Sequence, residues 1–211
     1  MKLELRNVKR DFVSRSGCHY TCIEDVNMEI HSGEFHLLYG ASGSGKTTLL
    51  NIMTGMLRPT EGQVLLDGTE IQGKKEQELA LLRRKSFGYA MQNASLLNSL
   101  TVAENISLPL TFFSGTGTAE EQLKKAGLWK VRNSYPSELS GGEYRRCTIL
   151  RALVIQPDFL FADEPTANLD DTNAEIIIEM LEHLREQGTA VVVATHDKRF
   201  MEDSRQIHEL G

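Results

Sequence analysis

The eight residues Gly40–Thr47, which read GASGSGKT, constrain the fold more than any other part of the chain. They match the spacing G-x-x-x-x-G-K-[ST], follow the apolar run Phe35–Tyr39 and precede Thr47–Met56, whose composition favours a helix. In a strand–loop–helix unit of this kind, glycines let backbone N–H groups point inward at phosphate oxygens, and the helix N-terminus adds partial positive charge. We therefore expect a phosphate-binding loop at the end of a strand.

The side chains of this loop point to a nucleotide with a magnesium ion. Lys46 is expected to reach the β- and γ-phosphates of ATP, and the Thr47 hydroxyl to bind Mg²⁺. A chance glycine-rich turn is disfavoured because a strand and a helix flank the loop. Alone, the motif does not separate kinases, GTPases, helicases and transporters. The remaining nucleotide-binding residues expected here are Gly40, Ala41, Ser42, Gly43, Ser44, Gly45 and Thr48.

A second motif lies where an apolar segment ends in two carboxylates. Phe159–Ala162 favours a buried strand and is followed directly by Asp163 and Glu164. Such a strand delivers its last residues to the crevice at the carboxyl edge of a parallel sheet, where ligands bind. Asp163 is expected to hold Mg²⁺, and Glu164 to polarise the attacking water. The alternative is a strand that stops at a solvated acidic turn, and the phosphate loop upstream weakens it.

The order of the remaining segments predicts an α/β fold. Alternation in Leu3–Phe12 and Thr21–Ile30 predicts antiparallel strands. The strands Phe159–Ala162 and Ala190–Ala194, with the helix Thr172–Glu186 between them, predict a parallel sheet covered on both faces. Further elements are predicted at Gln63–Leu66, Glu76–Lys85, Thr101–Phe113, Ala119–Ala126 and Gly142–Ile155. We expect a P-loop NTPase core with a mostly parallel sheet, an antiparallel β subdomain and an inserted helical lobe at about 93–156, within one domain of residues 1–211.

Composition limits the classes of molecule that the chain is expected to bind and the compartment in which it is expected to lie. The net charge of −6 lacks the basic excess of a nucleic-acid binder. No apolar run approaches the roughly 20 residues that cross a bilayer, and Met1–Arg10 lacks the apolar core of a signal peptide, so we expect a cytosolic protein. Cys18, His19 and Cys22 lie close together, but a zinc site needs further ligands, and side chains of a β-hairpin are the preferred interpretation.

The segment Leu139–Glu143, which reads LSGGE, is glycine-rich and opens a helix. It is therefore a second potential anion-binding N-terminus in the same chain. One nucleotide needs only one such cradle, so a second suggests nucleotide shared between two copies of the protein. The alternative, which we favour for the pentapeptide in isolation, is a helix cap by Ser140 beside flexible glycines.

The motifs in their joint order resemble the ABC ATPases over essentially the whole chain. The order is the phosphate loop, Gln92, Leu139–Glu143, Asp163–Glu164, Asn168–Asp170 and His196. The resemblance implies that Ser140, Gly141 and Gly142 of one protomer close over ATP held by another. It also implies that Gln92 senses Mg²⁺ and couples to a membrane subunit, that Asp170 crosses the dimer interface, and that His196 contacts the γ-phosphate. Phe12 fits the aromatic that stacks on adenine, with Tyr20 as a competing candidate.

Taken singly, these residues have simpler interpretations. Gln92 alone is consistent with a solvated loop residue, and His196 with a helix cap shared with Asp197. The surrounding residues are similar to the macrolide-exporter and lipoprotein-releasing ATPases, the MacB and LolD type. Three features depart from that group. Thr47 replaces the commoner Ser, which is equivalent for binding Mg²⁺. Thr111–Gly127 is several residues short, and Tyr144–Leu150 contains the unexpectedly polar Cys147 and Thr148.

The resemblance implies a Mg-ATPase whose two copies close around ATP and open after hydrolysis. That movement would drive a separate transmembrane permease, with this chain peripheral on the inner face of the cell membrane. The alternative is a soluble ABC ATPase acting on nucleic acid or ribosomes. It is disfavoured by the acidic charge, the single cassette and the lack of long insertions. A metabolic P-loop kinase would leave Leu139–Glu143 without a purpose.

Overall fold

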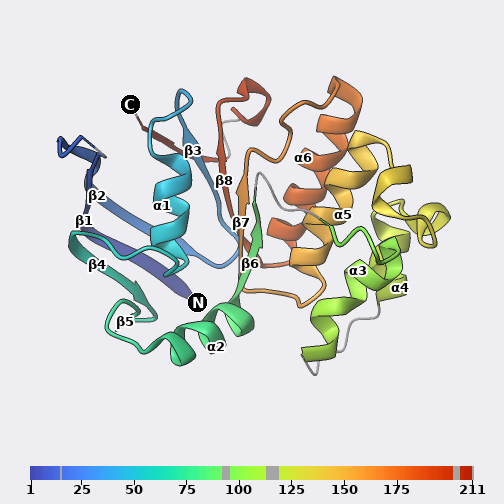
Figure 1. The fold of residues 1–211 in the computed structure, drawn as a ribbon, viewed down its shortest axis with the longest axis horizontal. Coiled ribbons are helices and arrows are strands. Elements are labelled where there is room, and N and C mark those ends of the chain that lie inside the picture. Colours follow the sequence, from blue (N-terminus) through green and yellow to red (C-terminus); the bar gives the residue numbers. More distant parts are fainter. Residues whose placement is uncertain (15, 92–95, 113–118, 202–204, 211) are drawn as a thin grey trace.

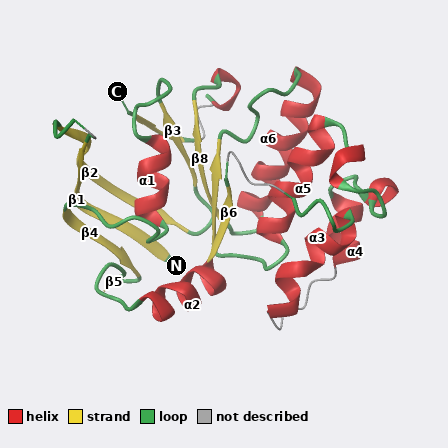
Figure 2. Cartoon of the chain, viewed as in Figure 1, coloured by secondary structure: helices red, strands yellow, loops and turns green. Residues whose placement is uncertain are grey.

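The structure, a computed structural model, describes residues 1–14, 16–91, 96–112, 119–201 and 205–210. Two sheets lie side by side, with α1 between them (Figure 1). An antiparallel sheet has the strand order β2-β1-β4-β5, and a parallel sheet has the order β6-β7-β8-β3-β9. Figure 2 shows the helices α3 to α6 gathered on the far side of the parallel sheet from the antiparallel one. The predicted α/β class is confirmed.

The strands and helices follow in chain order. The strands are β1 Lys2–Val13, β2 His19–His31, β3 Phe35–Tyr39, β4 Glu61–Leu66, β5 Thr69–Glu70, β6 Phe87–Ala90, β7 Phe159–Asp163, β8 Ala190–Thr195 and β9 Gln206–Glu209. The α-helices are α1 Lys46–Met53, α2 Glu76–Ser86, α3 Val102–Ser107, α4 Ala119–Lys125, α5 Gly141–Leu153 and α6 Asp171–Glu186.

The parallel sheet is buried on both faces because its central strands are continuously apolar. Along β7, Phe159 and Phe161 pack toward the cluster that contains α1, while Leu160 and Ala162 pack toward α5 and α6. Successive side chains of a strand point to opposite faces, so an unbroken apolar strand needs cover on both sides. The predicted parallel sheet, covered on both faces, is confirmed.

The helical lobe has a hydrophobic cluster of its own. It contains Leu96, Val102, Ile106, Leu123, Leu128, Cys147, Leu150 and Val154. Helix α5 contributes to this cluster and, through Ile149 and Leu153, to the cluster on the parallel sheet. The polar residues of α5 now have an explanation. Cys147 is fully buried in the lobe, and the buried Thr148 hydroxyl donates to the Arg145 carbonyl at 2.8 Å.

Four elements differ from the sequence prediction. The two-residue strand β5, which pairs with β4, was not predicted. β6 and β9 were not predicted, and both are short strands at the edges of the parallel sheet. The single helix predicted at Thr101–Phe113 is wrong. α3 ends at Ser107 and a 3-10 turn, Leu108–Phe112, follows it. Pro109 explains this change, because proline lacks the N–H that an α-helix needs at that point.

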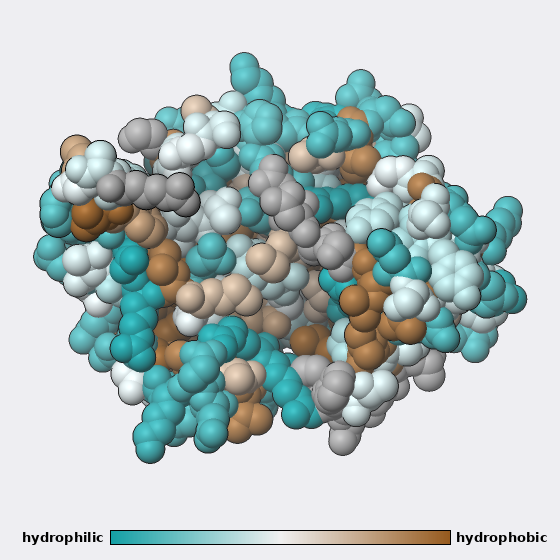
Figure 3. Space-filling model, in the orientation of Figure 1, coloured by the Kyte–Doolittle hydropathy of each residue, from teal (hydrophilic) through white to brown (hydrophobic). Residues whose placement is uncertain are grey.

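Hydrophilic side chains cover much of the face seen in Figure 3, and the hydrophobic ones form separate groups. One such group lies over the helical lobe, and a smaller one lies beside α2 (Figure 3). In the part of the chain that the structure describes, no helix combines the length and apolarity needed to span a bilayer.

A histidine pair ties the edge strand β9 to β3. His36 is fully buried, and its Nδ1 lies 3.1 Å from Nε2 of His208. Its Nε2 lies 2.9 Å from Glu34 Oε2. Burial, followed by the charge of His36, lowers the pKa of His208 to about 4. Burial also lowers the pKa of His36, against the opposing effect of Glu34.

The pKa of His208 predicts a loss of stability in acid. The unfolded state takes up protons below about pH 6.5 and the folded state only near pH 4, so the free energy of unfolding falls as the pH drops through this window. Between pH 7.5 and pH 5, urea unfolding should show the His208→Gln variant losing about 1 kcal/mol less than the unaltered protein. His19→Gln, at an exposed histidine, is the control. Equal losses in all three proteins would contradict the prediction.

Candidate functional site

The phosphate loop and the end of β7 enclose one cavity of about 180 Å³. Its lining joins segments that are more than a hundred residues apart in sequence: Cys22, Ser42, Gly43, Gly45, Lys46, Thr47, Thr48, Asp163 and Glu164. The structure therefore brings the two motifs predicted from sequence together. The predicted residues Gly40, Ala41 and Ser44 belong to the same loop but do not line this cavity.

The loop backbone requires glycine at several positions. Gly43 and Gly45 have φ angles of 86° and 93°, which L side chains rarely adopt. A Cβ on Gly40 would lie 2.1 Å from the carbonyl oxygen of Leu210, so the strand end beyond β9 leaves no space there. The loop is thus held tightly between its neighbours, and α1 begins directly after it at Lys46. This geometry is typical of a loop whose N–H groups and helix start bind an anion.

Lys46 lies folded over its own loop. The side chain is buried, and its ammonium donates to the carbonyl oxygens of Gly40 and Ala41, each at 2.8 Å. It also lies 3.9 Å from Glu164 Oε1. A buried ammonium needs partners of this kind, because desolvation of an unpaired charge is costly. The lysine is therefore held at the cavity by oxygens that a phosphate group is able to replace.

Thr47 and Asp163 form a pair suited to a divalent cation. The Thr47 hydroxyl donates to Asp163 Oδ2 at 2.8 Å. Among the described residues, no donor contacts Asp163 Oδ1, although this oxygen is buried. Burial raises the pKa of Asp163, and the Thr47 hydroxyl and Lys46 oppose that rise. A hydroxyl and a carboxylate with an unused oxygen are the hard ligands that Mg²⁺ prefers, so the residues present fit this ion.

Glu164 is held in an unusual backbone conformation at the centre of the site. Its φ of 46° lies in the left-handed region, where a residue with a side chain is uncommon. The carboxylate is fixed at both oxygens. The Thr195 hydroxyl donates to Oε2 at 2.7 Å, and His196 Nδ1 lies 2.8 Å from Oε1. An ionised carboxylate only accepts, so His196 then carries a proton on Nδ1.

Arg145 holds the backbone beneath the two acidic residues, and the sequence analysis gave it no role. Its guanidinium donates to the carbonyl oxygens of Asp163 at 2.8 Å and of Pro165 at 2.9 Å, and also to the carbonyl of Glu164. The side chain is buried, with 9% exposed. The sequence does contain one sign of this role. Arg145 precedes the buried residues Thr148 and Ile149 by three and four positions, and this spacing places all three on the same face of α5.

The Leu139–Glu143 segment forms a capping box within its own protomer. Ser140 Oγ accepts from the backbone N–H of Glu143 at 3.3 Å and donates to Glu143 Oε2 at 2.6 Å. This is the helix-cap interpretation considered for the isolated pentapeptide, and the structure confirms it. Gly141 and Gly142 form the first turn of α5, and Gly142 lies directly against α6. Contact of these three residues with a second copy stays a prediction.

Asp170 caps the helix α6, and Asp197 caps a short 3-10 turn, Lys198–Phe200. Asp170 is the N-cap of α6 and accepts from the backbone N–H of Asn173 at 2.8 Å. Asp197 accepts from the backbone N–H of Arg199, so the cap considered for the pair His196–Asp197 is made by the aspartate alone. The His196 ring instead turns to Glu164. Gln92 lies outside the described residues.

Phe12 and Tyr20 are partners across the hairpin of β1 and β2. The two rings stack with centroids 5.9 Å apart, and the Arg10 guanidinium lies 4.6 Å from the Phe12 centroid. Tyr20 is 54% exposed and lines a depression that also contains Gly43 and Ser44. Both candidates for the adenine contact therefore lie on one aromatic surface, and the choice between them stays open. Cys22, on the same hairpin, faces the Thr48 hydroxyl at 3.6 Å.

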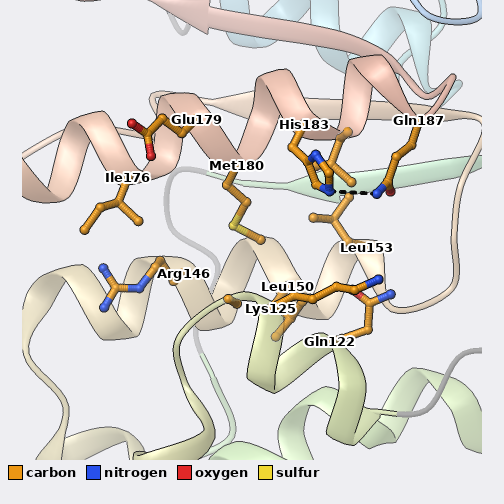
Figure 4. A pocket seen from close by; sticks show the side chains of 12 residues that line it. Gln122, Lys125, Arg146, Leu150, Leu153, Ile176, Glu179, Met180, His183 and Gln187 are labelled. Atoms are coloured by element: carbon orange, nitrogen blue, oxygen red, sulfur yellow. Dashed lines mark hydrogen bonds between the residues drawn. The ribbon is translucent and has the colours of Figure 1, made fainter.

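A larger cavity, of about 280 Å³, lies elsewhere in the molecule (Figure 4). It opens between α4, α5 and α6, with Leu150, Leu153 and Met180 among its lining. His183 and Gln187 are joined by a hydrogen bond at its edge (Figure 4). None of the predicted site residues lines this cavity. It marks the junction of two hydrophobic clusters, both of which contact Met180.

Comparisons with known proteins agree with the motifs. A family model described as ABC transporter matches residues 23–167. The lipoprotein-releasing system ATP-binding protein LolD of Aquifex aeolicus is 37% identical over 196 residues, which cover 90% of this chain and 88% of LolD. The macrolide export ATP-binding/permease protein MacB of Neisseria meningitidis is 35% identical over 213 residues. These cover 99% of this chain but 33% of MacB, so the chain spans about a third of that protein.

Solved structures of the MJ0796 cassette extend the likeness to three dimensions. A dimeric structure of this bacterial ABC transporter cassette matches with a TM-score of 0.89 and 36% identity, over 99% of this chain and 94% of that chain. A dimeric post-hydrolysis state of the same cassette, bound to ADP and Pi, matches equally well.

Arg145 is predicted to stabilise the site backbone. Arg145→Met removes the guanidinium from three buried carbonyl oxygens, of which that of Glu164 keeps another donor, the Ala167 N–H at 3.2 Å. We expect the free energy of unfolding in urea to fall by about 3 kcal/mol. Arg58→Met, at an exposed arginine, is the control and should change it by less than about 0.5 kcal/mol. Equal effects of the two substitutions would show that Arg145 does not support this backbone.

Proposed function

Since the chain belongs to the ABC transporter family, we propose that it hydrolyses ATP as the nucleotide-binding subunit of a transporter of the MacB and LolD type. The observation that carries this proposal is the joint geometry of the phosphate loop and the end of β7. Lys46, Thr47, Asp163 and Glu164 line one cavity, and Glu164 is fixed there from both sides.

Glu164, Lys46 and the phosphate loop have separate roles in this reaction. Glu164 accepts a proton from the attacking water, and Thr195 and His196 hold its two oxygens for that task. Lys46 leaves the carbonyls of its own loop and neutralises charge on the β- and γ-phosphates. The loop N–H groups, from Gly40 to Thr48, bind the phosphates and orient them.

Magnesium is held by the threonine and aspartate of the site. Thr47 Oγ1 and Asp163 Oδ1 are the ligand atoms available, and Gln92 is a further candidate from the sequence. When bound, Mg²⁺ supplies positive charge that stabilises the charge developing on the phosphates. Arg145 keeps Asp163 and Glu164 aimed into the cavity, because it binds the carbonyls of both residues.

A second copy of the chain completes the site. One protomer supplies the phosphate loop, and the other supplies Ser140, Gly141 and Gly142 at the start of α5. In support, the start of α5 is a helix N-terminus with small residues, and the structural relative MJ0796 is a dimer. His196 contacts the γ-phosphate, Asp170 lies at the interface, and Phe12 or Tyr20 stacks on adenine.

The output of the reaction is opening and closing of this dimer. Hydrolysis removes the γ-phosphate contacts with Ser140 and His196, and the two copies separate. The movement passes through Gln92 to a transmembrane permease, so the protein lies on the cytoplasmic face of the membrane. The chain acts as one domain, residues 1–211, with the helical lobe at about 93–156.

The alternative functions are not supported. A soluble ABC ATPase acting on nucleic acid or ribosomes disagrees with the net charge of −6, and the relatives LolD and MacB are transporter proteins. A metabolic kinase disagrees with membership of the ABC family.

Closure around ATP is the property to test. Glu164→Gln keeps the shape of the side chain but removes the carboxylate that accepts a proton, so ATP should bind without being consumed. Light scattering on this variant should then show a monomer without nucleotide and a dimer with Mg-ATP.

Two further substitutions separate binding from closure. Adding Ser140→Arg to Glu164→Gln should leave ATP binding by the monomer intact and prevent the dimer, because a large side chain fills the cradle at the start of α5. Adding Lys46→Ala should instead weaken ATP binding itself. A dimer that persists with Ser140→Arg would contradict the shared site, and normal ATP turnover by Lys46→Ala alone would contradict the role of the phosphate loop.

A further inference from the structure

The first turn of α6 touches the start of α5 through Asn173. A Cβ on Gly142 would lie 1.9 Å from Asn173 Oδ1, so the amide occupies the space that any larger residue would need. The same oxygen accepts from Arg146 Nη1 at 3.2 Å. α5 and α6 are in direct contact (Figure 1). The position of the Ser140–Gly142 cradle is therefore set by a side chain of α6.

The other end of the Asn173 amide holds Asp170. Its Nδ2 donates to both carboxylate oxygens of Asp170, each at 3.0 Å, and its backbone N–H donates to Oδ1 at 2.8 Å. The backbone and side-chain bonds from Asn173 lower the pKa of Asp170, so this carboxylate is ionised at neutral pH. One amide thus packs against Gly142 of the cradle on one side and donates to the N-cap of α6 on the other.

The same turn is joined to the segment after β8 by Arg199. Arg199 Nη1 donates to Asp171 Oδ1 at 2.7 Å, and its Nη2 donates to Asp197 Oδ2 at the same distance. The Thr166 hydroxyl adds a bond to Asp197 Oδ2 at 2.6 Å. Burial alone would raise the pKa of Asp197, but the bonds from Arg199 and Thr166 lower it to about 2. His196 directly precedes Asp197, so the turn that carries it is anchored to α6.

We propose that Asn173 and Arg199 are positioning residues that join the Ser140–Gly142 cradle, Asp170 and the His196 turn into one unit at the first turn of α6. In each protomer, the position of the cradle that faces the partner is then fixed relative to its own His196. This inference rests on the shared site proposed above and assigns two residues to its alignment. Neither residue lines the cavity that contains Lys46 and Glu164.

Asn173 is expected to affect closure of the dimer and to leave ATP binding by a single protomer unchanged. ATP binding by a single protomer uses the phosphate loop, which Asn173 does not contact. Closure of two protomers uses the cradle, which loses its alignment when the amide is removed. Substitution of Asn173 should therefore weaken the ATP-bound dimer while ATP binding by the monomer is unchanged.

The test uses the full chain carrying Glu164→Gln, with and without Asn173→Ala. The dissociation constant of the dimer in Mg-ATP, from light scattering over a concentration series, should rise about tenfold with Asn173→Ala, as expected for loss of a hydrogen bond to a charged group. Binding of a fluorescent ATP analogue at protein concentrations below dimer formation should be unchanged. Thr172→Ala, an exposed neighbour on the same turn, is the matched control and should leave both unchanged.

A pH profile distinguishes alignment from simple packing. Asn173→Asp keeps the shape of the side chain but places a carboxylate against Asp170. Arg146 Nη1, on the other side of this side chain, offsets part of the repulsion between the two carboxylates. The remaining repulsion should weaken the dimer at neutral pH, whereas on acidification toward about pH 4.5 a shared proton restores the hydrogen bond. The ratio of the dimer dissociation constants of this variant and the Glu164→Gln parent should therefore fall on acidification. A ratio that does not change with pH would contradict a role for the donated hydrogen bond.

Arg199→Gln tests the other half of the unit. It should weaken the dimer as Asn173→Ala does, again without loss of ATP binding by the monomer. If the Glu164→Gln parent itself fails to dimerise with Mg-ATP, the shared site is wrong. If the parent dimerises and both variants dimerise equally well, the shared site stands and the positioning role is overturned.

Discussion

The hydrogen bonds from Arg145 to the backbone after β7 support the rest of the site. A parallel sheet ends its strands at one edge, but it does not by itself fix the residues beyond that edge. Here the guanidinium binds three successive carbonyls, from Asp163 to Pro165, and Glu164 takes a left-handed conformation above it. Because Arg145 belongs to α5, the acidic residues and the helix that carries the cradle are fixed to each other.

The sequence predicted the parts of the fold that depend on periodicity and on glycine. The apolar runs of β3, β7 and β8 and the spacing of the phosphate loop led directly to the parallel sheet and its edge. β6 and β9 were not predicted, because four-residue edge strands carry little pattern of their own. The helix over Thr101–Phe113 was predicted too long, because the prediction overlooked that Pro109 cannot donate a backbone hydrogen bond.

The site was predictable as a set of residues and less so as a network. Lys46, Thr47, Asp163 and Glu164 follow from motif chemistry, and the structure brings them to one cavity. The residues that hold these four in place could not be predicted from motifs. Arg145 binds main-chain carbonyls, whose positions depend on the completed tertiary fold. Thr195 is the last residue of a buried strand, and only the pairing of β7 with β8 places its hydroxyl beside Glu164.

In the protomer, groups that we propose to contact ATP or the second copy already have hydrogen-bond partners within the chain. Lys46 donates to its own loop, Ser140 to Glu143, and the carboxylate of Asp170 accepts from Asn173. Binding of nucleotide would replace these hydrogen bonds by others. Because these groups already have partners, the net free energy gained from each new contact is modest. A modest difference between open and closed states is what a cycle of repeated closure and release requires. Two atoms of the site are exceptions among the described residues, because Ser44 Oγ and Asp163 Oδ1 are buried without a hydrogen-bond partner. At Asp163 Oδ1 a bound cation would gain the most.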